Sequence, residues 1–168
     1  MLVGYEAFAP EVYARHCAWM ALALKQAELA GNQGEIPVGA VLVNGINQEI
    51  LAIAHNRKEE TKDPTAHAEI LAIRQASQRL KTWHLENCHL YVTLEPCPMC
   101  AGAIVHARLG LLVYGADDPK TGAIRSVLNL PDSRASNHHL TAIGGVLESD
   151  CRQLLQNWFQ QKRSSQPP

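Results

Sequence analysis

The chain has 168 residues and a formal net charge of −1 at pH 7, with 46% hydrophobic and 18% charged residues. These proportions are those of an ordinary globular protein of about one domain. No stretch approaches the roughly 18 uninterrupted apolar residues of a membrane span, which excludes a membrane-spanning helix. The near-neutral charge gives no global positive field, so a nucleic acid would have to be held by a local patch.

The cysteines separate into two groups. The N-terminal sequence lacks the basic start and unbroken apolar run of a secretory signal, so we expect reduced thiols and a cytoplasmic protein. Cys17, Cys88 and Cys151 fall on predicted apolar helix faces or beside a predicted strand, as small buried hydrophobic side chains do. Only Cys97 and Cys100 are spaced as a pair.

The first part of the chain predicts a helix followed by a β-hairpin. Apolar residues recur at helical spacing over 10–30, and Gly31 favours the end of that helix. A nearly all-apolar strand is predicted over 37–43, and the Asn44-Gly45 pair predicts the turn that stops it. Residues 49–56 predict the returning strand.

The rest of the chain alternates helices and strands. A helix is predicted to begin at Asp63-Pro64-Thr65, where Asp or Thr would cap it, with Ile70, Ile73 and Leu80 on its buried side. The further predicted elements are, in chain order, a strand at 89–94, a helix from Pro98 to Gly110, a strand at 111–116, a loop with a short helix over 117–139, a weaker strand at 140–146 and a final helix with an apolar stripe at Cys151, Leu154, Leu155, Trp158 and Phe159. The polar end, 164–168, predicts disorder.

This order of elements indicates the fold class. Strands separated by single helices favour parallel pairing, whereas the hairpin is antiparallel. The sequence therefore predicts one α/β domain with a mixed sheet covered by helices.

Two short motifs carry the chemistry, "DPTAHAE" at 63–69 and "PCPMC" at 96–100. His67, Cys97 and Cys100 supply imidazole and thiolate, the ligands that zinc takes in a tetrahedral shell. Cys97 and Cys100 are three apart, so they share a face at the start of a helix. If Pro98 is the first helical residue, Cys97 lies at the cap, where free N–H groups and the helix dipole favour its thiolate.

These motifs leave three interpretations: a catalytic metal site, a structural metal site, or coincidence. No second Cys-x-x-Cys exists, and His67 has no partner His three to five residues away, which favours an open site with three ligands. Glu69 follows His67 by two residues, so in a regular helix the two side chains point to opposite sides. Both reach one ion only in an irregular first turn, or if Glu69 aims at a bound water and moves protons. The alternative for Glu69 is a solvated surface carboxylate.

The motifs resemble the His-x-Glu and Pro-Cys-x-x-Cys pattern of zinc-dependent nucleoside and nucleobase deaminases, the cytidine deaminase superfamily. Flanking segments such as "GEIPVGAVLV", "HNR", "LYVTLEPCPMCAGAIVHARLG" and "YGADDPKTGA" are similar to the bacterial tRNA-specific adenosine deaminases, over about residues 12–163. The resemblance implies a single deaminase domain over 1–168. Its fold would be three-layer α/β/α and cytidine-deaminase-like, with a central mixed five-stranded sheet.

The resemblance also implies a reaction, the hydrolysis of adenosine to inosine with release of ammonia. His67, Cys97 and Cys100 would hold one zinc ion per chain, and Glu69 would be the proton shuttle. Asn56 would hydrogen-bond the target nucleoside. The implied pocket walls are the side chains of Ile36, Pro37, Val38 and Leu94, the carbonyl of Glu95 and the backbone of Ala68.

The implied substrate is the wobble adenosine, position 34, in the anticodon loop of an arginine tRNA, bound by a homodimer. Unpaired loop bases are what proteins most often read in RNA. The implied RNA contacts are Asp118, Lys120, Asn137, His138 and Phe159. The C-terminal end departs from a strongly basic helix, since Lys162 and Arg163 are its only cations, which predicts weaker binding with a shallower salt dependence.

Two other functions fit the motifs. A small-molecule deaminase, with guanine deaminase as the nearest candidate, would share the zinc chemistry and suit the near-neutral charge. A non-enzymatic zinc-stabilised RNA-binding domain would instead need a fourth protein ligand and would unfold when a chelator removes the metal.

Overall fold

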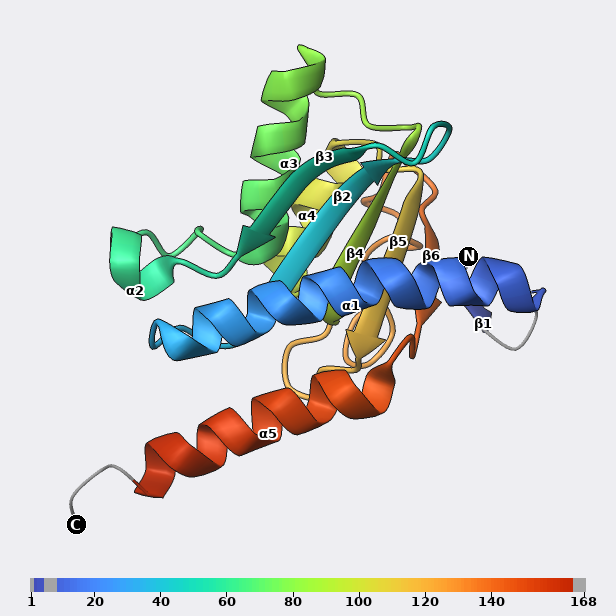
Figure 1. The fold of residues 1–168 in the computed structure, drawn as a ribbon. Helices are drawn as coiled ribbons and strands as arrows, with labels where there is room; N and C mark the ends of the chain where they lie inside the picture. Colours follow the sequence, from blue (N-terminus) through green and yellow to red (C-terminus); the bar gives the residue numbers. More distant parts are fainter. Residues whose placement is uncertain (1, 5–8, 165–168) are drawn as a thin grey trace.

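The computed structural model describes residues 2–4 and 9–164 (Figure 1). Its elements are β1 (Leu2–Gly4), α1 (Pro10–Asn32), β2 (Gly39–Asn44), β3 (Ile50–His55), α2 (Lys58–Thr61), α3 (Ala68–Leu80), β4 (Cys88–Leu94), α4 (Pro98–His106), β5 (Leu111–Ala116), β6 (Thr141–Gly144) and α5 (Glu148–Ser164). Within these ranges, every helix is too short or too polar to cross a membrane.

The strands form one mixed sheet in the order β1-β6-β5-β4-β2-β3. β2 is antiparallel to both β3 and β4, whereas β4, β5 and β6 are parallel neighbours. The five predicted strands all form, and the prediction of a mixed sheet is confirmed. β1 adds a sixth strand beside β6 that was not predicted, because three residues are too few to show a pattern.

Helices cover both faces of the sheet (Figure 1). α1 crosses the front of the sheet, and α3 and α4 lie behind it. Alternate residues of neighbouring strands face opposite layers: Val41 and Tyr91 pack with Met20 of α1, whereas Leu42 and Leu90 pack with the alanines of α3. The central strands β2 and β4 are therefore apolar on both faces, as the prediction of a three-layer α/β/α fold requires.

α3 begins later than predicted. Its first residue is Ala68, and the side chain of Asp63 accepts hydrogen bonds from the Thr65 N–H and hydroxyl at 2.8 and 2.7 Å. The predicted capping residues therefore form a turn of their own, and the cap position falls to His67. α2, a single turn at Lys58–Thr61, was also not predicted.

Two further predictions differ from the structure. The segment 117–139 contains turns and no helix in the described residues, so the predicted short helix is wrong. The predicted disordered tail covers Ser164, which is the last residue of α5, and 165–168, which lie outside the described residues.

Candidate metal centre and active-site cleft

The topology brings the two motifs to the same edge of the sheet. β3 and β4 are both antiparallel to β2, which lies between them, so their carboxyl ends meet there beside the beginning of β2. α3 follows β3 after the single turn of α2 and a short loop, and α4 follows β4 after three residues. His67 is the N-cap of α3 and Cys97 is the N-cap of α4, with Pro98 as the first helical residue. Two helix N-termini therefore face one place.

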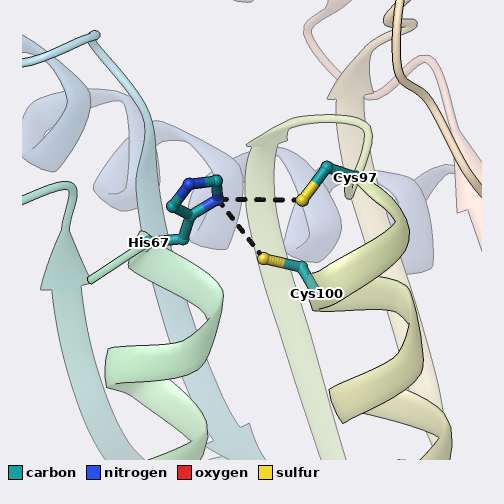
Figure 2. Close-up of side chains that lie close together, drawn as sticks. All are labelled: His67, Cys97 and Cys100. Carbon is teal, nitrogen blue, oxygen red and sulfur yellow. Dashed lines mark hydrogen bonds between the residues drawn. The ribbon is translucent and has the colours of Figure 1, made fainter. Parts of the chain in front are cut away.

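The three predicted ligands meet at these helix starts (Figure 2). Nδ1 of His67 lies 3.8 Å from Sγ of Cys97 and 3.5 Å from Sγ of Cys100. All three ligand atoms lie within 4.8 Å of one another, and no fourth His, Cys, Asp or Glu of the described chain joins the group.

This geometry fits a zinc ion. Bonds of about 2.3 Å to sulfur and about 2.0 Å to nitrogen place two ligands of a tetrahedral zinc about 3.5 Å apart, close to the separations observed. Two thiolates and one imidazole are a zinc donor set, and three protein ligands are the number typical of a catalytic site.

The titration of the cluster also suits a cation. Hydrogen bonds from Cys100 and His67 lower the pKa of Cys97 to about 4, against the opposing effect of burial. The hydrogen bond to Cys97, followed by burial, raises the pKa of Cys100. The hydrogen bond to Cys97 raises the pKa of His67, while burial and the charge of Lys58 act in the other direction. Ionisation of Cys97 therefore opposes ionisation of Cys100, and a bound divalent cation would stabilise both thiolates.

Glu69 is buried beside this cluster. The residue is 4% exposed, and Oε2 has no hydrogen-bond partner in the described structure. Burial raises the pKa of this carboxyl. Because buried polar atoms are nearly always paired, the orphaned oxygen indicates a position meant for a bound molecule. His67 has extended backbone angles, so it does not share the helical spacing of Glu69, and both side chains line the same cleft.

The cleft has a volume of about 150 Å³. Its lining residues are Ile36, Val38, Asn56, Lys58, His67, Glu69, Leu94, Glu95, Cys97, Asp118 and Thr121. Five predicted pocket residues are among them. Pro37 and Ala68 are buried and do not line the cleft, because their positions along the chain alternate with those that do.

Asn56 joins two walls of this cleft. Its Nδ2 donates to the carbonyl of Ile36 at 3.1 Å, and its Oδ1 accepts from the Ala68 N–H at 2.9 Å. Asn56 as a whole is 4% exposed, so most of its surface is in contact with the protein. Each amide atom retains capacity for one more hydrogen bond, which can serve a ligand in the cleft.

The side chain of Glu95 has a role that sequence analysis missed, since only its carbonyl was considered. Oε2 accepts from the Asp118 N–H at 3.0 Å and from the Ser126 hydroxyl. Oε1 accepts from the N–H groups of Ile124, Arg125 and Ser126 at 3.0, 2.7 and 3.0 Å. Burial raises the pKa of this carboxyl, but the hydrogen bonds outweigh it and the net pKa is lowered. One buried carboxylate thus shapes the loop that borders the cleft.

Lys58 and Thr121 were also missed as cleft residues. Thr121 donates its hydroxyl to Oδ2 of Asp118 at 2.6 Å, so the Asp-x-x-Thr spacing of a capped turn could have indicated it. No sequence signal distinguishes Lys58 from the neighbouring charged residues 57–60.

A second groove, of about 470 Å³, lies between the 116–120 segment and α5. Its lining includes Lys120, Arg152, Phe159 and Arg163, two of which are predicted RNA contacts. His138 lies elsewhere: its Nε2 is 2.7 Å from the carbonyl of Leu109, beyond the end of α4 opposite to Cys97. Asn137 is its exposed neighbour, and neither lines the cleft or the groove.

The chain is similar to known deaminases. The MafB19-like deaminase family model matches residues 14–163. A tRNA-specific adenosine deaminase of Bacillus subtilis is 48% identical over 145 residues, which cover 86% of this chain and 89% of the relative. A solved structure from work on A-to-I editing by tRNA:A34 deaminases at the wobble position of transfer RNA has a TM-score of 0.79 and 43% identity, covering 82% of this chain and 99% of that one.

A guanine deaminase from Nitrosomonas europaea has a TM-score of 0.72 at 25% identity, covering 89% of this chain and 84% of that one. The fold is therefore common to deaminases that differ in substrate. The sequence identity is higher to the tRNA-specific adenosine deaminases than to this guanine deaminase. The chain belongs to the MafB19-like deaminase family and, within it, to the tRNA-specific adenosine deaminases.

Proposed function

We propose that this protein converts adenosine to inosine at wobble position 34 of a tRNA anticodon, with an arginine tRNA as substrate. The single observation that carries the proposal is the cleft in which the orphaned carboxylate of Glu69 adjoins the His67, Cys97 and Cys100 cluster. The 48% identity to a tRNA-specific adenosine deaminase supports tRNA as the substrate class. We further propose that the whole chain, 1–168, forms one deaminase domain.

His67, Cys97 and Cys100 would hold one zinc ion per chain. When bound, zinc supplies Lewis-acid activation of water at neutral pH. The three protein ligands orient the site from two helix starts. The burial of Cys100 and Glu69 excludes bulk water from its inner side.

Glu69 would move the protons of the reaction. Deamination forms a C6–O bond, breaks the C6–N bond and releases ammonia, so protons must pass from water to the purine ring and to the leaving amine. Because burial raises the pKa of the Glu69 carboxyl, it holds the first proton more readily than an exposed carboxyl does and can pass it on to the leaving amine. Its free Oε2 gives it a position from which to do both.

The rest of the cleft would hold the extruded base. Ile36, Val38 and Leu94 form apolar walls, and Asn56 offers one further donor and acceptor at its edge. Enzymes that act on a base in a nucleic acid take it out of the stack into such a pocket.

The groove beside α5 would accept the flanking RNA. Lys120 and Arg163 supply positive charge, and Phe159, 42% exposed, supplies a surface for stacking. Arg152 is paired with Glu148 of its own helix, and Asp117 with Arg125. This local patch is what a chain of net charge −1 requires to bind a polyanion. We further propose that the protein acts as a homodimer. Asn137 and His138 line neither the cleft nor the groove, so they would contact RNA only where the RNA extends beyond both. An enzyme that edits tRNA would act in the cytoplasm.

The test is incubation of the zinc-loaded protein with an anticodon stem-loop, free adenosine and free guanine, followed by sequencing for adenosine read as guanosine at position 34. We expect conversion of the stem-loop. Ammonia release from guanine without conversion of the stem-loop would instead support guanine deaminase, the second candidate, which the structural similarity to that enzyme favours. Zinc-dependent folding and RNA binding without any deamination would support the non-enzymatic alternative.

A further inference from the structure

Lys58 is the cationic residue of the cleft. Among the described residues that line it, the carboxylates of Glu69, Glu95 and Asp118 are the acidic groups, and Lys58 is the one Lys or Arg. Its charge also acts on the His67 ring, as expected for a group at the same cleft. Neither the metal cluster nor the proton transfers require this lysine.

The backbone around Lys58 is fixed. The Arg57 N–H donates to the carbonyl of Ala66 at 3.0 Å, which ties the start of α2 to the residue before His67. The Glu60 N–H donates to Oε1 of Glu35 at 2.9 Å, and Glu35 is itself buried. These contacts hold the single turn of α2 against the cleft.

The charged neighbours of Lys58 pair among themselves. Arg57 forms an ion pair with Glu60 at 2.6 Å, and Lys62 lies 3.8 Å from Glu59. The ammonium of Lys58 takes part in no hydrogen bond or ion pair with any described residue. A half-buried, unpaired cation on a fixed turn is available to an anionic ligand.

The size of the cleft decides which part of a ligand Lys58 meets. Pockets that enclose drug-sized ligands have volumes of roughly 300–1,000 Å³. A cleft of about 150 Å³ can enclose a base but not a whole nucleotide. Lys58 also lines a neighbouring hollow of about 70 Å³ together with Gly34 and Glu59, so it stands at the border of the cleft, where the sugar–phosphate would remain.

We propose that Lys58 binds a phosphate flanking the target nucleotide, so that the cleft selects a base within an RNA strand over a free base. The inference rests on the proposed function and deepens it. The alternative role for Lys58 is to balance the charge of the neighbouring carboxylates. Only the phosphate contact couples the lysine to one particular linkage of the RNA.

The experiment compares the zinc-loaded wild type with Lys58→Ala and Lys58→Arg. Lys62→Ala is the matched control, because Lys62 ends the same turn and is highly exposed. Binding is measured with a product stem-loop that carries inosine at position 34, which is not turned over. A second pair of stem-loops carries a neutral methylphosphonate linkage immediately 5′ or 3′ of that inosine.

We expect Lys58→Ala to bind the stem-loop about threefold to tenfold more weakly. The slope of log K against log salt should fall by about 0.7 to 0.9, the value of one phosphate contact. One of the two methylphosphonates should weaken the wild type by a similar factor and leave Lys58→Ala unchanged. Lys58→Arg should keep most of the affinity, and Lys62→Ala should behave as the wild type.

The phosphate contact would be overturned if the affinity losses from Lys58→Ala and from the methylphosphonates were independent and simply multiplied. It would also be overturned if the salt slope of Lys58→Ala equalled that of Lys62→Ala. Conversion of an adenosine-34 stem-loop by the wild type is measured separately. If the wild type binds with the expected coupling but converts nothing, the proposed function fails and the contact stands. If it converts the stem-loop without the coupling, only the contact fails.

Discussion

The backbone at His67 determines what two neighbouring residues can do. Its angles, φ −78° and ψ 150°, are extended, so it stands outside α3, whereas Glu69 is already helical. A pair that would diverge in a regular helix therefore converges on one cleft. The sequence predicted Cys97 at a helix cap, because Pro98 marks the first helical residue. It did not predict His67 at a cap, because Asp63 and Thr65 offered a competing start.

The first prediction concerns the proton transfers. Replacing Glu69 with Ala should lower the deamination rate by about 100-fold to 10,000-fold, the usual contribution of general acid–base catalysis. The zinc content should stay at about one ion per chain, since Glu69 is not among the three ligands. The measurements are initial rates on the stem-loop and elemental analysis of the purified variant, with the exposed Glu59→Ala as control. An active Glu69→Ala enzyme would contradict the assignment.

Replacing Glu95 with Ala tests the loop that it shapes. The variant would leave several buried N–H groups without an acceptor, at about 1–3 kcal/mol for each group that water cannot reach. We expect a lower free energy of unfolding in urea and weaker stem-loop binding, because Asp118 and Lys120 lose their support. Glu95→Gln keeps one oxygen acceptor and should fall between. Exposed Glu86→Ala serves as the control, and equal stability of Glu95→Ala and wild type would refute this role.

At the level of elements, α3 shows what periodicity misses. Its buried side is formed by Ala68, Ala72 and Ala76, spaced four apart. Of the predicted residues, Ile73 and Leu80 pack half-buried against the core, and Ile70 is half-buried. The large apolar residues of α3 gave the stronger periodic signal in the sequence, but its small alanines let the helix lie close against the sheet. The strands were easier to predict, because burial on both faces makes them short apolar runs. The loop over 117–139 has no apolar periodicity, and its shape depends on the carboxylate of Glu95, the residue that follows β4.

A pair of glycines tests the packing of the layers. A Cβ at Gly39 would meet the carbonyl oxygen of Ala23 in α1 at 2.1 Å, so β2 and α1 would have to separate. Gly39→Ala should therefore lower the midpoint of urea unfolding. A Cβ at Gly102 in α4 would meet nothing within 4 Å, so Gly102→Ala should stabilise by about 0.5–1 kcal/mol through its better helix propensity. Equal effects of the two substitutions would contradict this account of the α1 layer.

At the level of the whole molecule, the order of the strands creates the site. The antiparallel β2 between β3 and β4 places the carboxyl ends of β3 and β4 beside the beginning of β2. The motif with Cys97 and Cys100 closely follows β4, and the motif with His67 follows β3 after α2. Sequence patterns predicted the strands and the motifs separately. The crossover that makes β4 the neighbour of β2 is a long-range property, so periodicity could not place Ile36 and Val38 beside Cys97.

The face of the sheet under α1 carries a buried polar pair that makes stability depend on pH. Nδ1 of His16 lies 3.0 Å from the hydroxyl of Tyr91, and His89 lies on the same strand face. Burial lowers the pKa of His16, and the charges of His89 and Arg15 lower it further; burial also lowers the pKa of His89. Both rings are thus harder to protonate in the folded state than in the unfolded one.

The lowered pKa values of these histidines make the folded state less stable at acidic pH. The unfolded chain binds protons at the ordinary histidine pKa of about 6.5, and the folded chain binds them only at lower pH. Stability from these groups is therefore complete above about pH 6.5 and is lost as the pH falls through the lowered folded values. Protonation of the metal ligands adds to this loss, so the test compares a variant with the wild type. His16→Asn keeps an amide that can meet the Tyr91 hydroxyl. Its midpoint of urea unfolding should decline less than that of the wild type between about pH 7 and pH 5. Parallel declines in the two proteins would assign the acid sensitivity to other groups.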